Sequence, residues 1–146
     1  MEINIRKAET SDFNQINALF KELAEFENLP EMMTNTVERM VAEKDYFNCF
    51  VAETSDNQIV GYATYFFCYY TWIGKSLYMD DLYVKTDFRG QGLGSALIQK
   101  VISHAKETGC HKLRWQVSGW NHPAIDFYKK LGAEVNGVEQ NCDLVF

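Results

Sequence analysis

The sequence contains no long apolar run, no closely spaced pair of cysteines and no excess of positive charge, and each absence excludes a class of protein. A membrane-spanning helix needs about 20 consecutive apolar residues, and no run here approaches that length. The four cysteines lie far apart and form neither a C-x-x-C pair nor a zinc motif with histidine. We therefore expect a globular protein with no membrane partner, no metal and free, buried thiols.

Basic residues are outnumbered by acidic ones. The chain has 14 Lys and Arg against 20 Asp and Glu, a net charge of -6, and its pI is near 5.0. Nucleic-acid-binding proteins usually present a basic face, so we expect no nucleic-acid partner and a mild preference for cationic ones. The segment MEINIRKAETSDF lacks the basic region and apolar core of a secretion signal, so we expect a cytoplasmic protein.

The length of 146 residues predicts a single domain, 1–146, that is large enough to bury a core. Hydrophobic periodicity and turn residues divide the chain into strands and helices. The predicted strands are 3–8, 46–54, 58–70, 76–86 and 112–118, followed by a hairpin of two within 133–146. The predicted helices are 13–26, 36–44, 93–108 and 121–133. This order predicts an α/β (α+β) protein.

A glycine-rich segment, FRGQGLG (88–94), lies between the strand 76–86 and a long amphipathic helix. Glycines leave no Cβ in the way of backbone N–H groups, and those groups together with a helix N-terminus form an anion site. A Walker loop would need a lysine where Ser95 follows the last glycine. A dinucleotide loop would need glycine at that position and a place in the first strand–helix unit.

The pattern that remains is R/Q-x-x-G-x-G/A, filled by Arg89, Gly92 and Gly94. It resembles the acetyl-CoA loop of the GNAT superfamily of N-acetyltransferases, whose element order is similar to this chain over all 146 residues. The segments YTWIGKSLYMDDLYVKTDFRGQGLGS and WNHPAIDFYKKLGA resemble the spermidine/spermine acetyltransferase branch, which includes thialysine-acetylating relatives. The alternative is a glycine-rich helix start without a ligand.

The resemblance implies a GNAT fold. Its central sheet is mixed but mostly antiparallel, with about six to seven strands, about four flanking helices, and parallel strands 4 and 5 that splay apart. It also implies acetyl-CoA as co-substrate, a small-molecule amine as substrate and a homodimer.

By the same resemblance, a set of residues is expected to bind acetyl-CoA. The diphosphate is expected at the loop, and the pantetheine arm along the strand before it. The set comprises Leu82, Tyr83, Val84, Arg89, Gly90, Gln91, Gly92, Leu93, Gly94, Ser95, Asn121 and Tyr128. From the residues alone, Arg89 also fits a surface salt bridge, and Asn121 a helix N-cap.

Two residues are expected to move protons. An alkylamine with a pKa near 10.4 arrives protonated, so a carboxylate must take its proton. Strand alternation predicts that Asp80 and Asp81 lie on opposite faces, and the resemblance puts Asp80 at the base position, where many relatives carry glutamate. The resemblance also makes Tyr128 the acid that protonates the departing thiolate. The alternatives are a strand-end carboxylate that only holds a cation, and a tyrosine that only packs.

Acidic residues crowd the end of the first predicted helix and the loop after it, where this branch binds its acceptor. They are joined in a predicted substrate site by an aromatic residue and the two aspartates: Glu27, Glu31, Trp72, Asp80 and Asp81. The alternative is a solvated helix end. Tyr70 and Thr71 stand where polyamine enzymes carry an acid and a proline, which favours the thialysine-type relatives. Acetylation of a protein or peptide amine and a non-catalytic acyl-CoA-binding module remain the alternative functions.

Overall fold

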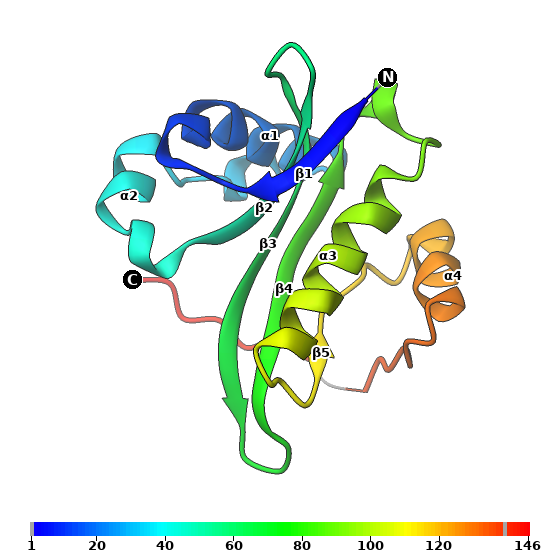
Figure 1. Ribbon diagram of the computed structural model, residues 1–146. Helices are drawn as coiled ribbons and strands as arrows, with labels where there is room; N and C mark the ends of the chain where they lie inside the picture. The colour runs from blue at the N-terminus through cyan, green and yellow to red at the C-terminus, as the bar shows by residue number, and fades with distance from the viewer. Residues whose placement is uncertain (1, 139) are drawn as a thin grey trace. The chain divides into compact units, whose positions relative to one another are not determined.

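The computed structural model describes residues 2–138 and 140–146 and divides into two compact units, Met1–Trp115 and Gln116–Phe146 (Figure 1). The first unit contains the strands β1 (Ile3–Lys7), β2 (Asn48–Thr54), β3 (Ile59–Tyr70), β4 (Gly74–Val84) and β5 (Leu113–Arg114). Its helices are α1 (Phe13–Phe26), α2 (Val37–Ala42) and α3 (Leu93–Glu107), with 3-10 turns η1 (Thr10–Asp12), η2 (Pro30–Met32), η3 (Lys44–Tyr46) and η4 (Thr86–Phe88). The second unit contains α4 (His122–Lys130).

Within the described residues the sheet has five strands in the order β1-β2-β3-β4-β5. The first four pair antiparallel and β5 pairs parallel to β4, so the predicted mixed, mostly antiparallel sheet is confirmed. The expected count of six to seven strands is too high. β5 is shorter than the predicted strand 112–118, and neither 134–138 nor 140–146 contains a strand.

The predicted terminal hairpin does not form within residues 133–138 and 140–146. The turn expected near Asn136 is present locally, since the side chain of Asn136 accepts a hydrogen bond from the Val138 N–H at 3.0 Å. The apolar side chains beyond the turn, Leu144, Val145 and Phe146, are exposed, so no buried face fixes a register there.

Helices cover both faces of the sheet in the first unit, as two neighbouring residues of β3 show (Figure 1). The ring of Tyr62 lies 5.2 Å from the ring of Phe20 on α1. A Cβ at Gly61 would lie 3.3 Å from Leu97 on α3 and 2.9 Å from the Tyr83 carbonyl oxygen. Because successive residues of a strand point to opposite faces, α1 and α3 lie on opposite sides of the sheet. Glycine at position 61 permits this close packing.

The core on the α1 side is built from the apolar positions that recur every three or four residues along α1, as the sequence predicts. Its buried members are Phe13, Ile16, Leu19, Met40, Cys49, Val51, Ile59, Tyr62 and Tyr83. All four cysteines are free thiols, but Cys49 alone is buried, and Cys142 is exposed. The expectation that all the thiols are buried is therefore wrong.

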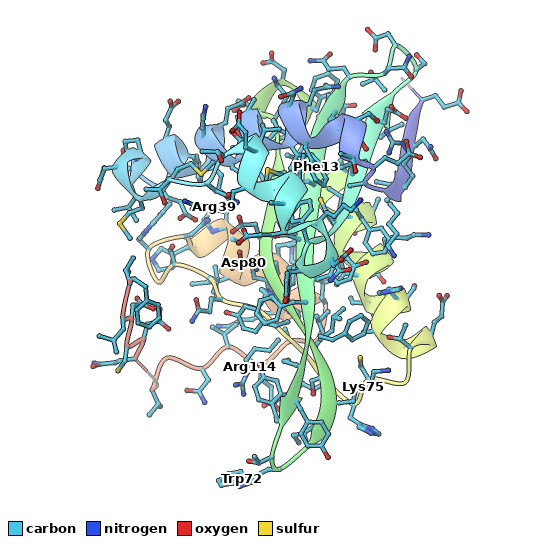
Figure 2. The ribbon with its side chains drawn as sticks, turned by 90° about the vertical axis from the view of Figure 1, so that its left-hand side faces the viewer. Phe13, Arg39, Trp72, Lys75, Asp80 and Arg114 are labelled. Atoms are coloured by element: carbon cyan, nitrogen blue, oxygen red, sulfur yellow. The ribbon has the colours of Figure 1, made fainter. Side chains whose placement is uncertain are left out.

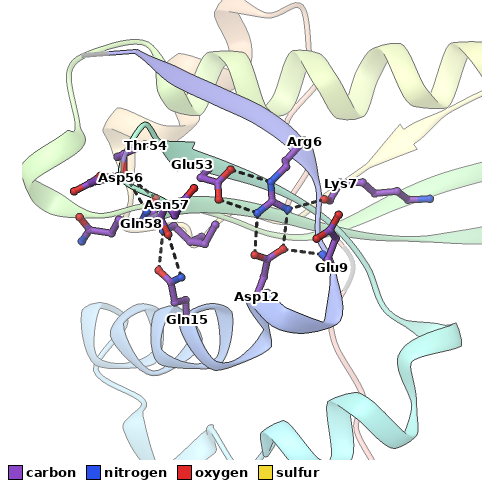
Figure 3. Close-up of polar contacts among 11 residues, drawn as sticks. Arg6, Lys7, Glu9, Asp12, Gln15, Glu53, Thr54, Asp56, Asn57 and Gln58 are labelled. Carbon is purple, nitrogen blue, oxygen red and sulfur yellow. Dashed lines mark hydrogen bonds and ion pairs between the residues drawn. The ribbon is translucent and has the colours of Figure 1, made fainter.

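A charged network ties the edge strand β1 to its neighbours (Figure 3). The Arg6 guanidinium donates to both carboxylate oxygens of Asp12, at 2.8 and 2.9 Å, and to both of Glu53, at 3.0 Å. These bonds hold the pKa of Asp12 and Glu53 below their usual values. The network joins β1, β2 and the start of α1, and it places one positive charge between two negative ones.

Candidate active site

A β-bulge in β4 positions the two aspartates. Tyr65 pairs with Met79 and Thr64 pairs with Asp81, so Asp80 is an extra residue opposite no partner on β3. The strict alternation that would separate Asp80 from Asp81 is interrupted between them. The prediction that they lie on opposite faces assumed an unbroken strand, and the bulge removes that assumption. The two carboxylates interact, since the charge of Asp80 raises the pKa of Asp81.

Asp81 is held by two residues of β3. Its carboxylate accepts a hydrogen bond from the Tyr62 hydroxyl at 3.3 Å, and its backbone N–H donates to the Thr64 hydroxyl at 3.1 Å. Burial, followed by the charges of Asp80 and Glu27, raises the pKa of Asp81 to about 7, against a lowering by the Tyr62 hydrogen bond. Asp81 therefore exchanges its proton near neutral pH.

Asp80 differs from Asp81 in its exposure. Its side chain reaches solvent at the bulge, and partial desolvation still raises the pKa of its carboxylate. The Asp80 carboxylate is therefore exposed to solvent and also interacts electrostatically with Asp81. The bulge thus presents one exposed acid, Asp80, next to one half-buried acid, Asp81.

The predicted substrate residues are only partly brought together. Glu27, just beyond α1, lies close enough to Asp81 to raise its pKa. Glu31 lies farther along, in η2, and is exposed. Trp72 is 96% exposed at the tip of the β3–β4 hairpin, well separated from Asp80 (Figure 2). At about 3.3 Å per residue, Gly74 alone is already about 20 Å from Asp80 along β4, so Trp72 does not reach these carboxylates within the unit.

The neighbouring Glu22 is neutralised. Its carboxylate accepts a hydrogen bond from the Tyr83 hydroxyl at 3.2 Å and lies 3.5 Å from the Lys85 ammonium. Near the bulge, the negative charge available to a cationic substrate therefore comes from Glu27, Asp80 and Asp81.

The glycine loop has the conformation that its sequence predicts. Gly90 and Gly92 have φ values of 79° and 81°, in the left-handed region that favours glycine. Gly92 is the N-cap of α3, and the first helical hydrogen bond runs from the Ala96 N–H to the Gly92 carbonyl at 3.0 Å. The N–H groups of Leu93, Gly94 and Ser95 precede that bond, so the helix itself offers them no acceptor.

Arg89 connects this loop to β4. Its Nε donates to the Val84 carbonyl at 2.8 Å, and its guanidinium lies over the rings of Phe26 and Tyr83, at 5.0 and 5.4 Å from their centroids. These contacts take the place of the surface salt bridge weighed from the sequence. They fix the direction in which the loop leaves the strand.

The free edge of β4 runs past residues 82–84. The Lys85 N–H donates to the Val60 carbonyl, so by alternation Tyr83 also faces β3, while Leu82 and Val84 face the other edge. On that edge the described pairing with β5 is limited to Leu77 and Tyr78. Leu82 and Val84 therefore present backbone groups beyond the end of β5, as an added strand would require.

The second unit holds the other two predicted site residues. Asn121 caps α4, with its side chain accepting a hydrogen bond from the Ala124 N–H at 3.4 Å, so the N-cap interpretation is confirmed. Tyr128 is the buried residue of α4, and burial raises the pKa of its phenol. The phenol is therefore protonated at neutral pH.

Residues 13–133 match the model of the acetyltransferase (GNAT) family. The chain belongs to this family. Thialysine N-epsilon-acetyltransferase of Bos taurus is 40% identical over 143 residues, covering 90% of this chain and 84% of that protein. The protein of the same name from Caenorhabditis elegans is 35% identical over 118 residues, covering 78% and 72%. The resemblance stated from the sequence is thus confirmed, and the protein is an N-acetyltransferase.

Solved structures support the GNAT fold. An aminoglycoside acetyltransferase from an uncultured soil metagenomic sample has a TM-score of 0.80 at 23% identity, covering 99% of this chain and 100% of that one. An acetyltransferase of Trypanosoma brucei has a TM-score of 0.79 at 24% identity, covering 98% and 100%. In the described part of this acetyltransferase, no helix is both long and apolar enough to cross a membrane.

Tyr62 and Thr64 of the acetyltransferase were not identified from its sequence. Both lie in the aromatic run QIVGYATYFFCYY, where nothing distinguishes them from core residues. Their role depends on which residues of β4 lie opposite them, and the bulge determines that pairing. A sequence search would have to place the bulge at the two adjacent aspartates to find them.

Proposed function

We propose that the chain transfers the acetyl group of acetyl-CoA directly to a primary amine of a small cationic substrate, either lysine-like, as thialysine is, or a diamine or polyamine. The names of the relatives support the thialysine class, and the anionic bulge region supports a cationic acceptor. The observation that carries the proposal is the pair formed by an open glycine loop and adjacent, titratable carboxylates within one unit.

Gly94 supports a ligand at the loop most directly. It lies in the first turn of α3 with no positive φ, and among the described residues nothing lies within 4 Å of the place its Cβ would occupy. A helical glycine costs about 1 kcal/mol relative to alanine, and neither space nor conformation inside the protein requires it. Close approach of a ligand to the backbone explains it. The helix N-terminus favours an anion such as the coenzyme A diphosphate.

The remaining part of the cofactor would lie along β4. The edge-facing backbone of Leu82 and Val84 suits the amide-rich pantetheine arm, as an added strand would pair. The Val84 carbonyl already accepts from Arg89, so Leu82 offers both of its backbone groups. Asn121 and Tyr128 are proposed to complete the binding site.

On the acceptor side, we assign the proton transfer to the bulge. Asp81 and Glu27 bind the positively charged ammonium group of the substrate. Asp80 then takes a proton from this ammonium, directly or through a water. The amine nitrogen then forms a bond to the acetyl carbon, and the carbon–sulfur bond breaks to release the thiolate. Tyr128 donates its phenol proton to that thiolate, and the second proton that the nitrogen loses as the amide forms restores the phenol. An acetyl-cysteine intermediate on Cys49 is disfavoured, because burial raises the pKa of this thiol and keeps it protonated.

Thiol release from acetyl-CoA tests the proposal across a panel of thialysine, lysine, spermidine, diamines and short peptides, alongside calorimetry with coenzyme A. We expect coenzyme A binding and turnover of a small amine. In Tyr128→Phe, kcat is expected to fall about 100-fold with coenzyme A binding retained, because the variant lacks only the acidic proton. Binding without turnover would favour an acyl-CoA-binding module, turnover of peptides alone would favour a protein acetyltransferase, and no binding would overturn the assignment.

A further inference from the structure

We propose that Tyr62 is a positioning residue of the acceptor site, which holds the Asp81 carboxylate in the orientation and charge state that an ammonium ion binds. This inference rests on the proposed function, because it gives Asp81 the substrate amine as its partner. Tyr62 itself acts only through Asp81.

The placement of Tyr62 permits this role. Its side chain is fully buried, with 0% exposure, and its ring is fixed between Phe20 at 5.2 Å and Tyr83 at 6.2 Å. Its hydroxyl is directed at Asp81 and donates to the carboxylate at 3.3 Å. Burial and the charge of Asp81 raise the pKa of this phenol well above its usual value, so it stays a donor throughout the physiological range.

A second residue of the same strand face supports the arrangement. Thr64, two residues beyond Tyr62, is buried and accepts the Asp81 N–H at 3.1 Å. The bulge displaces this N–H from the regular ladder, and the threonine hydroxyl provides its acceptor. Side chain and backbone of Asp81 are therefore each bound to β3, which leaves the carboxylate little freedom to turn away.

Among the interactions around Asp81, the Tyr62 hydrogen bond is the one that favours the ionised carboxylate. Burial and two carboxylates disfavour the ionised form, and the Tyr62 hydroxyl favours it. The titratable groups that interact with Asp81 come from β2, β3, β4 and the segment after α1: Cys49, Tyr62, Tyr78, Asp80 and Glu27. Loss of the phenol donor therefore raises the pKa of Asp81, and less of the acceptor site is ionised at neutral pH.

The chain offers a matched control on the same strand. Tyr65 is also buried, but its hydroxyl has no hydrogen-bond partner among the residues described. Tyr65→Phe and Tyr62→Phe remove the same atom from the same kind of environment. Only the second change removes a hydrogen bond to Asp81.

The test is a carbon-13 NMR titration of the Asp81 carboxyl in the wild type and both variants, with the amine kcat/KM measured over the same pH range. In Tyr62→Phe we expect the Asp81 midpoint and the acidic limb of kcat/KM to rise together by about one pH unit. A charge-assisted hydrogen bond to the ionised carboxylate lowers its pKa by about that much, and the variant lacks this bond. At pH 7 the amine KM is expected to rise about fivefold, with kcat nearly unchanged. Tyr65→Phe is expected to move none of these.

An unchanged Asp81 midpoint in folded Tyr62→Phe would overturn the inference, as would an equal shift in Tyr65→Phe. If Tyr62→Phe fails to fold, the carbon-13 resonance of the Tyr62 ring carbon that bears the hydroxyl is followed over pH in the wild type and in Asp81→Asn. We expect it to shift at the Asp81 midpoint in the wild type and not in Asp81→Asn, and a resonance that does not respond in the wild type also overturns the inference. Because the NMR titration needs no turnover, absence of acetyl transfer in the wild type would overturn the proposed function separately, whatever the midpoints are.

Discussion

The bulge in β4 and the glycine loop after η4 follow one another closely in the chain, but they are built in opposite ways. At the bulge, the polar groups of Asp81 are bound by Tyr62 and Thr64 and surrounded by buried side chains. In the loop, Gly90, Gly92 and Gly94 have no described atom within 4 Å of where a Cβ would be. One segment is enclosed and hydrogen-bonded, and the other is open.

This difference follows from what each segment has to do. A carboxylate that exchanges protons near neutral pH needs fixed partners and partial desolvation, because these set its pKa. Backbone amides that bind an anion need unobstructed approach, because any Cβ would hold the ligand away. Arg89 joins the two segments through the Val84 carbonyl, so the open loop leaves the enclosed strand at a defined point.

Asp81→Asn is expected to produce the largest effect on activity, since it removes the charge and leaves the shape. We expect kcat/KM for the amine to fall about 100-fold at pH 8, through loss of ammonium binding and of the neighbouring charge that assists Asp80. Steady-state kinetics with the preferred amine measures this. Kinetics equal to the wild type would show that the amine does not bind at Asp81.

The same substitution is expected to stabilise the protein. The pKa of Asp81 is about 7 in the folded chain, above the ordinary 3.8, so between these values the folded state holds a proton that the unfolded state releases. Stability therefore falls as pH rises through this window, and the loss is complete above pH 7. Asparagine does not titrate, so the variant does not lose this stability. We expect the free energy of unfolding of Asp81→Asn, measured relative to the wild type, to be about 1 kcal/mol higher at pH 8 than at pH 4, after allowance for solvent screening. Urea unfolding at both pH values measures this difference.

Gly94→Ala and Gly92→Ala test the open segment. Gly94 has a helical conformation, so alanine is expected to stabilise the free protein by about 0.5 to 1 kcal/mol while weakening coenzyme A binding about tenfold, because its methyl obstructs the diphosphate. Gly92 has a φ of 81°, so alanine there is expected to destabilise by about 1 kcal/mol. Thermal unfolding and calorimetry separate the two. Unchanged coenzyme A affinity in Gly94→Ala would place the diphosphate elsewhere.

The sequence predicted the open segment much better than the enclosed one. The loop is local, since its glycines and the helix start lie within a few consecutive residues. The partners of Asp81 depend on pairing across the sheet: from Tyr70 opposite Gly74, an unbroken ladder would place Thr64 opposite Asp80. One inserted residue puts Asp81 there instead, and periodicity does not reveal such a shift. The terminal strands were overpredicted because an apolar pattern does not show whether a partner covers it: Leu144, Val145 and Phe146 are exposed.

Thr64→Val is expected to have the smallest effect and tests what maintains that one-residue shift. Valine keeps the branched shape that suits a strand but leaves the Asp81 N–H without its acceptor, at an expected loss of about 1 kcal/mol in the free energy of unfolding. Thr64→Ser retains the hydroxyl and serves as the control. If urea unfolding gives equal stability for the two variants, the hydroxyl does not hold the bulge. In that case the pairing of β3 with β4 on either side maintains the bulge, and the Tyr62 hydroxyl is the side-chain group of β3 that holds Asp81.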